Sequence, residues 1–173
     1  SKIGDVELLT REGEVEAAKR IEEGRNRVLR ALLSSPVAVR EILEAGRRLR
    51  RGLVCLKHVV ETDELDGDDG EPCVDHQRVL RQFERVRRLN CTASKLRADL
   101  RRRGLSRADR TRLRNRITRH ERKMFEVLRD LHLHPTLVNE TVANLKKLSA
   151  QTRRLAAGGR RGRAELKKLE AEL

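Results

Sequence analysis

The chain contains no tryptophan and no tyrosine, and only two of its 173 residues are phenylalanine. Proteins that capture single-stranded bases stack them on exposed aromatic side chains, and each stacked base is worth roughly 1–3 kcal/mol. Phe83 and Phe125 both fall on the apolar side of predicted helices, so we expect both to be core residues. The chain by itself is therefore expected neither to melt DNA nor to stack bases.

Long apolar runs are also missing. The longest covers only residues 53–56, whereas a membrane-spanning helix needs about 20 apolar residues. The three cysteines have no disulfide-framework spacing, and the first residues lack the pattern of a secretory signal. We therefore expect no membrane partner and a cytoplasmic location. Because the chain begins with Ser1 and stops at Leu173 inside a helical pattern, we also expect it to be a piece of a longer protein.

Positive charge is what the chain has in excess: 41 lysines and arginines against 27 acidic residues give a net charge of +14. Basic side chains that neutralise phosphates release counterions, so such a chain favours polyanions without reading their sequence. The acidic residues are concentrated in residues 61–75, which hold eight carboxylates and no lysine or arginine. Setting this stretch aside leaves the remainder at +22, so a bound polyanion must avoid it.

The composition and the apolar spacing predict an all-α fold, an irregular bundle of about five or six helices with a mobile acidic loop. We expect one helical domain over residues 1–173, made of a first segment (1–34), a variable helical region (35–157) with the acidic loop at 61–74, and a basic linker leading into a further helix (158–173). Apolar residues at intervals of three and four predict helices over residues 10–34, 36–51, 75–103, 106–131 and 136–157.

Residues that cap helices support these boundaries. Ser35 precedes a proline, which is favoured at the first helical position. Ser106 with Asp109 three residues later resembles a capping box. Gly104 can take the left-handed conformation that ends a helix, and Pro135 interrupts the chain between the last two helices.

The string at residues 6–24, VELLTREGEVEAAKRIEEG, closely resembles the segment that follows the start of region 1.2 in bacterial primary sigma factors. Gly4 also fits the pattern of that family. A looser similarity covers residues 124–155, where MFEVLRDLHLHPTLVNETVANLKKL looks like the end of the variable region between region 1.2 and region 2. The chain is thus identified as a fragment of a primary sigma factor.

The resemblance implies a part of a transcription initiation factor that directs RNA polymerase to promoters. The fragment would support the promoter-binding domain, with core RNA polymerase and protein regulators as partners and promoter DNA bound by the full-length parent. In the family, region 1.2 helps to contact the non-template strand, which suggests Ser1, Lys2 and Arg11 as DNA-binding residues here. The identification requires that the string be helical and joined to the helical body.

Residues 97–123 contain twelve basic and three acidic residues. One interpretation is a surface that follows phosphates or docks an acidic partner, and the other is the solvated side of two amphipathic helices. Arginines at alternate positions point to several sides of a helix, so we expect no single stripe. The candidates for a basic docking surface are Arg101, Arg102, Arg103, Arg110 and Arg114.

Two C-x-x-H pairs, Cys55 with His58 and Cys73 with His76, flank the acidic stretch. Together they have the ligand set of a tetrahedral zinc site, which would make the chain a zinc-stabilised interaction domain. Cys55, however, lies in an apolar run where a buried thiol is routine. We expect no metal and no other cofactor, and no catalytic motif predicts an enzyme. A further alternative is a stand-alone basic helical module that binds nucleic acid without sequence preference.

Overall fold

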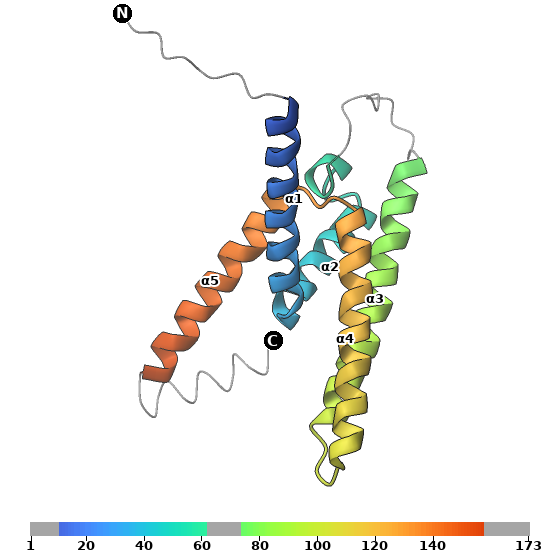
Figure 1. Ribbon diagram of the computed structural model, residues 1–173, viewed down its shortest axis with the longest axis vertical. Helices are drawn as coiled ribbons and strands as arrows, with labels where there is room; N and C mark the ends of the chain where they lie inside the picture. Colours follow the sequence, from blue (N-terminus) through green and yellow to red (C-terminus); the bar gives the residue numbers. More distant parts are fainter. Residues whose placement is uncertain (1–10, 62–73, 158–173) are drawn as a thin grey trace, which may run out of the picture.

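The computed structural model describes residues 11–61 and 74–157, which are 85% helical and contain no strand (Figure 1). This confirms the predicted all-α, irregular bundle. The predicted acidic loop falls almost wholly, and the predicted linker at 158–173 entirely, outside the described residues. The elements are α1 (Arg11–Leu33), α2 (Pro36–Arg50), the 3-10 turn η1 (Leu56–His58), α3 (Val74–Leu100), α4 (Arg107–Asp130) and α5 (Pro135–Ala157).

The predicted caps start their helices. The Ser35 hydroxyl oxygen accepts a bond from the backbone N–H of Ala38 at 3.5 Å, ahead of the proline that begins α2. At the start of α4, the Ser106 hydroxyl accepts from the backbone N–H of Asp109 at 3.0 Å and donates to its carboxylate at 2.6 Å. Both arrangements satisfy amide groups that have no partner inside the helix, so the local sequence fixes these two starts.

The connection between α3 and α4 differs from the prediction. The helix ends at Leu100, three residues before the expected position, and residues 101–103 form a tighter turn. The backbone N–H groups of Arg101 and Arg102 each donate to the carbonyl three residues earlier, which is the 3-10 pattern of a closing helix end. Gly104 then adopts a φ of +83°, and its freedom from a Cβ allows the chain to reverse.

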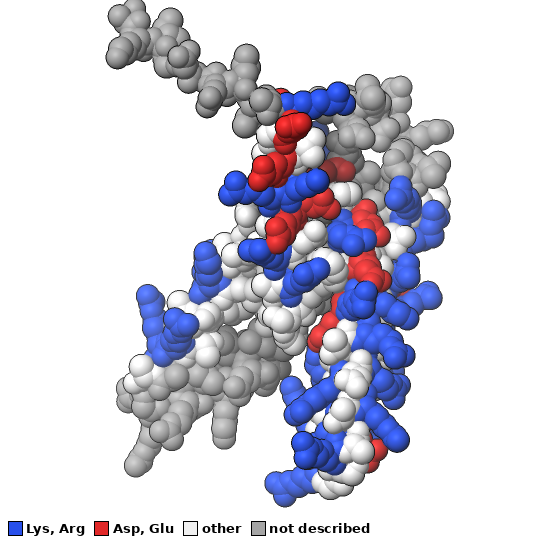
Figure 2. Space-filling model, in the orientation of Figure 1, with Lys and Arg blue, Asp and Glu red and all other residues white. Residues whose placement is uncertain are grey.

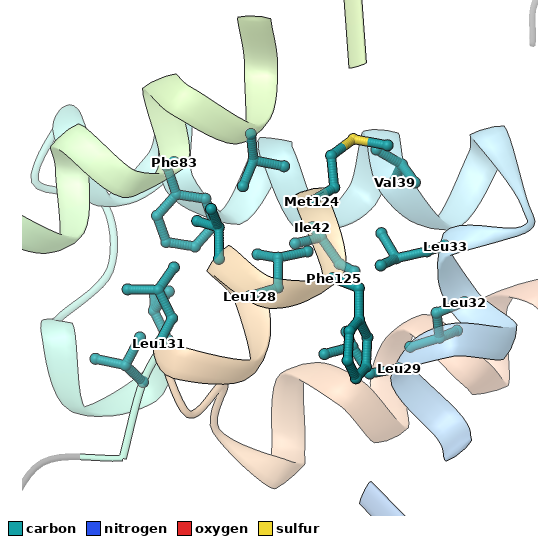
Figure 3. Close-up of a cluster of buried hydrophobic side chains, with 14 of the residues drawn as sticks. Leu29, Leu32, Leu33, Val39, Ile42, Phe83, Met124, Phe125, Leu128 and Leu131 are labelled. Atoms are coloured by element: carbon teal, nitrogen blue, oxygen red, sulfur yellow. The ribbon is translucent and has the colours of Figure 1, made fainter. Parts of the chain in front are cut away.

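The core lies where α1, α2, α3 and α4 meet (Figure 3). Phe83 is 4% exposed and Phe125 is 9% exposed, which confirms both as core residues. The guanidinium carbon of Arg30 lies 4.7 Å from the centre of the Phe125 ring, so that ring also has a cationic neighbour. The buried cluster further includes Leu29, Leu32, Leu33, Val39, Ile42, Leu49, Val79, Val86, Met124, Leu128 and Leu131, with four residues of α5 packed against it: Leu137, Val138, Val142 and Leu145.

The α4–α5 junction is tied to the segment that follows η1. Val60 and Leu133 form an isolated antiparallel bridge. Beside it, the backbone N–H of Glu61 donates to the carbonyl of His132 at 2.8 Å, and His132 itself has a φ of +48°. The Glu61 carboxylate accepts two bonds from the guanidinium of Arg25, at 2.8 and 2.9 Å. Glu61 therefore links α1 to the junction, with its carboxylate bonded to Arg25 and its backbone N–H bonded to His132.

Helices α3 and α4 form a long antiparallel hairpin whose far half extends beyond the other helices (Figure 1). The extended half has a seam of its own, because Ala93, Leu96 and Ile117 are 0%, 5% and 8% exposed. Arg97 of α3 and Glu121 of α4 form an ion pair of 2.7 Å across this seam. The far half of the hairpin is thus packed along a seam between α3 and α4.

None of the described helices combines the length and the apolar character needed to cross a bilayer.

Candidate docking and nucleic-acid interfaces

Helix α1 is covered along only part of its apolar side. Near its end, Leu29, Leu32 and Leu33 are all less than 8% exposed and belong to the core. The earlier apolar residues of the same predicted face are exposed, with Val15 at 48%, Ile21 at 59% and Val28 at 40%. Only the last turns of α1 are therefore buried among the described residues.

The exposed stretch of α1 borders a groove of about 530 Å³. Ala18, Ile21 and Val28 line it from α1, and Leu128, Leu133 and Val138 are among the residues that line it from the α4–α5 junction. Arg25, whose guanidinium is paired with Glu61, also lines it, as do the charged residues Glu22 and Arg129. The lining is nevertheless mostly apolar, which suits the apolar face of a helix better than a polar ligand.

The three residues predicted to bind DNA are not brought together by the described structure. Ser1 and Lys2 lie outside the described residues, and Arg11 is the exposed first residue of α1. Their role in binding DNA stays a prediction.

The predicted basic docking residues gather at the free end of the hairpin, where Figure 2 shows basic side chains over much of the visible surface. Arg101, Arg102 and Arg103 lie in the turn, and Arg110 and Arg114 follow on the first turns of α4. Arg102 is paired with Asp99 at 3.3 Å. The fold therefore joins residues from two predicted helices into one basic end.

The arginines at alternate positions do not form one stripe, as predicted, but the helix sorts them into two rows. Arg110 and Arg114 belong to one flank of α4. A second row, which the sequence reasoning missed, lies on the other flank at intervals of four, three and four residues: Arg112, Arg116, Arg119 and Lys123. All four are exposed, and within the described residues none has an acidic side chain at ion-pair distance. The apolar residues Ile117 and Met124 mark the buried side of α4, and they were the signal that could have located this row away from that side.

The base of the hairpin has a different charge balance. Glu84 of α3 is bonded by Arg87 at 2.6 and 2.9 Å, by Arg88 at 3.3 Å and by Arg50 of α2 at 3.4 Å. The bonds from Arg87, followed by those from Arg88 and Arg50, lower the pKa of Glu84 from 4.5 to about 2. Three basic groups here are engaged by one carboxylate, and the bond from Arg50 joins α2 to α3, whereas no described carboxylate pairs with the second row on α4.

The residues of the zinc alternative are only partly described. Cys55 and His58 lie exposed at η1, His76 lies in the first turn of α3, and Cys73 lies outside the described residues. Among the described residues, no three His, Cys, Asp or Glu side chains are grouped closely enough to hold a metal ion. The four-ligand site that includes Cys73 is not tested by this arrangement.

Comparison with known proteins places the first residues in a family. Residues 1–27 match the family model described as Sigma-70 factor, region 1.2. Residues 11–27 of this match lie in α1 and include Ile21 and Arg25, which line the groove. No solved structure matches the chain. The resemblance drawn from residues 6–24 is thereby confirmed.

Proposed function

We propose that this chain, which carries the region 1.2 segment of a sigma-70 family factor, supports the promoter-binding domain of a transcription initiation factor. Its role is structural and not catalytic, and it acts in the cytoplasm. Core RNA polymerase and protein regulators are its partners, and promoter DNA is bound by the full-length parent. The single observation that carries the proposal is the family match over residues 1–27.

The continuity of α1 supports a bracing role. Within α1, residues 11–27 of the match continue without interruption into Leu29, Leu32 and Leu33, which are buried in the core. The bidentate pair between Arg25 and Glu61 adds a second attachment. Because a helix transmits position along its length, the bundle fixes the direction in which the region 1.2 segment leaves it.

The groove beside α1 supplies a surface through which the chain would brace the rest of that domain. Matched residues line one side of it, among them Ile21, which is 59% exposed, and Val28 directly after the match is 40% exposed. We assign this groove to an apolar helix of the same promoter-binding domain. The continuity of the groove with the matched segment is the reason for choosing that occupant.

Substitution Ile21→Glu in the full-length parent protein tests this assignment. Burying an isoleucine side chain is worth about 1.5–3 kcal/mol, so a charge at this position should lower promoter-directed transcription by core polymerase at least about tenfold. Leu53→Glu is a matched control, since Leu53 is 61% exposed and does not line the groove. It should change the transcript yield less than about twofold, on the scale of a surface substitution.

Both variants should keep the wild-type melting curve, because neither residue is buried in the described fold. Equal transcription by Ile21→Glu, Leu53→Glu and wild type would contradict the assignment of the groove. Failure of the wild-type parent to direct core polymerase to promoters would contradict the proposed function itself.

The second candidate function is a stand-alone basic helical module that binds nucleic acid without sequence preference. The basic end of the α3–α4 hairpin favours it. This candidate predicts that the activity of the chain, nucleic-acid binding, needs no polymerase, whereas the first predicts an activity that requires core polymerase. Comparing the parent with a parent variant that cannot bind core polymerase in a transcription assay therefore separates the two.

A further inference from the structure

We infer that the row formed by Arg112, Arg116, Arg119 and Lys123 binds the phosphate backbone of double-stranded DNA without reading its sequence. We call it the α4 row. The choice of DNA as the polyanion rests on the proposed function. The binding chemistry rests on the geometry of the row itself.

The positions of the α4 row share one flank because an α-helix advances by about 100° per residue. Intervals of four, three and four residues keep the four side chains within about 60° of one another around the helix axis. Ile117 and Met124, on the buried side of α4, are 8% and 0% exposed. The row therefore lies on a face that the hairpin seam leaves open.

The length of the α4 row suits a duplex. Eleven residues separate its ends, which is about 17 Å of helix, and the same length of duplex axis carries about ten phosphate charges. All four cations can meet phosphates at once without bending the protein. Three of the four are arginines, whose planar guanidinium groups match phosphate oxygens in a bidentate way.

The charge along this row is not neutralised within the described structure. Arg122, the neighbour of Lys123, is paired with Glu126 at 3.2 Å, but no described carboxylate lies within 4.0 Å of the basic groups of the row. The next positions along the same flank, Glu126 and Asp130, are acidic. A polyanion would therefore follow the row toward the free end of the hairpin and leave it beyond Lys123.

The surroundings of the row favour a duplex over a single strand or a protein. Beside the row, α4 exposes Asn115, which can hydrogen-bond to phosphate, and among the described residues it exposes no large apolar side chain that could act as an anchor. Protein interfaces depend on such anchors at their centre. Single-strand binding depends on aromatic platforms, and the two phenylalanines of the chain are buried. Phosphate contact along a duplex needs neither.

The test is the affinity of the full 173-residue chain for a labelled 25-base-pair duplex, measured by fluorescence anisotropy over a range of salt concentrations. The first variant carries Arg112→Gln, Arg116→Gln, Arg119→Gln and Lys123→Gln. The matched control also replaces three arginines and one lysine, but at exposed positions away from the row: Arg48→Gln, Arg153→Gln, Arg154→Gln and Lys57→Gln. Far-ultraviolet circular dichroism and melting curves establish that both variants remain folded.

Each lost phosphate contact reduces the slope of log affinity against log salt by about 0.9. Four contacts therefore predict a slope less negative by about 3.5, and an affinity at 0.1 M salt that is lower by on the order of 10³-fold. The control should change the slope by less than about 1. A scrambled duplex should bind as well as a promoter duplex, and a single strand of the same length should bind less tightly.

Equal slopes for the two variants would overturn the inference, because diffuse charge would then account for all binding. If the row variant kept the DNA affinity of the wild type, the inference would also be overturned, and an acidic protein would remain as the partner of the row. In either case the Ile21→Glu experiment would still stand, since the groove and the α4 row share no residue. Loss of DNA binding in the row variant, together with failure of the wild-type parent to direct core polymerase to promoters, would instead contradict the proposed function alone.

Discussion

Replacing Gly46 by alanine should destabilise the chain, because the added Cβ atom of α2 would collide with Phe83 of α3. A Cβ atom at Gly46 would lie 2.6 Å from Cγ and Cδ1 of Phe83 and 3.0 Å from its Cβ. These atoms are the root of a side chain that is only 4% exposed, so they cannot swing away as the end of a long side chain can. Adding a methyl group to a filled core costs about 1–3 kcal/mol.

The helix propensity of alanine acts in the opposite direction, and Gly24 isolates that contribution. In a helix interior, alanine is favoured over glycine by about 1 kcal/mol. A Cβ at Gly24 of α1 would have no atom within 4 Å, so Gly24→Ala should stabilise the chain by about that amount. The difference between the two variants is therefore the cost of the contact with Phe83, about 1–3 kcal/mol.

Thermal and urea unfolding followed by circular dichroism would measure this difference. For a chain of this size it corresponds to a gap of about 2–12 °C between the two melting temperatures. In the Phe83→Ala background, where Cγ and Cδ1 are absent and only the 3.0 Å approach to Cβ remains, Gly46→Ala should cost much less, and the two substitutions should be non-additive. If Gly46→Ala stabilised the chain as much as Gly24→Ala does, the close packing of α2 on α3 would be refuted.

Two further predictions concern α3 and the start of α4. The bonds from Arg87 hold the pKa of Glu84 at about 2 against an ordinary 4.5. Because the pKa is lower in the folded state, this group stabilises the fold above pH 4.5, and the stabilisation is lost as the pH falls toward 2. Glu84→Gln should flatten the pH dependence of the unfolding free energy in that window, and an unchanged pH profile would contradict the assignment. Ser106→Ala should cost about 1 kcal/mol by removing the cap that pairs with Asp109, and faster amide hydrogen exchange confined to the first turn of α4 would confirm that the loss is local.

Most helix boundaries could be predicted because they depend on neighbouring residues. Ser35 and Ser106 cap helices through bonds to residues three positions later, and Gly104 provides a positive φ, all within one turn of chain. The end of α3 was placed three residues late, at 103 in place of Leu100. The spacing of apolar residues cannot locate this helix end, because residues 101–103 are all arginine and include no apolar position that would mark the last turn.

The candidate surfaces were predicted less completely, since each depends on what packs against a helix. The apolar spacing of α1 gave no reason to separate Ile21 from Leu29, yet one is 59% exposed and the other is 7% exposed. Likewise, the basic end was found by counting charges, but the row containing Arg112 and Arg116 was missed. Phasing that row required knowing which side of α4 is buried.

Sequence alone determined the all-α class, the helix starts, the excess of positive charge and the resemblance to region 1.2, because each of these depends on residue type and short spacing. Only the tertiary structure decided how far α1 is covered, that Gly46 lies against Phe83, and that the flank of α4 carrying Arg112 and Arg116 is left open. Those features arise from contacts between residues far apart in the chain, and a one-dimensional pattern does not specify which face of one helix meets which face of another.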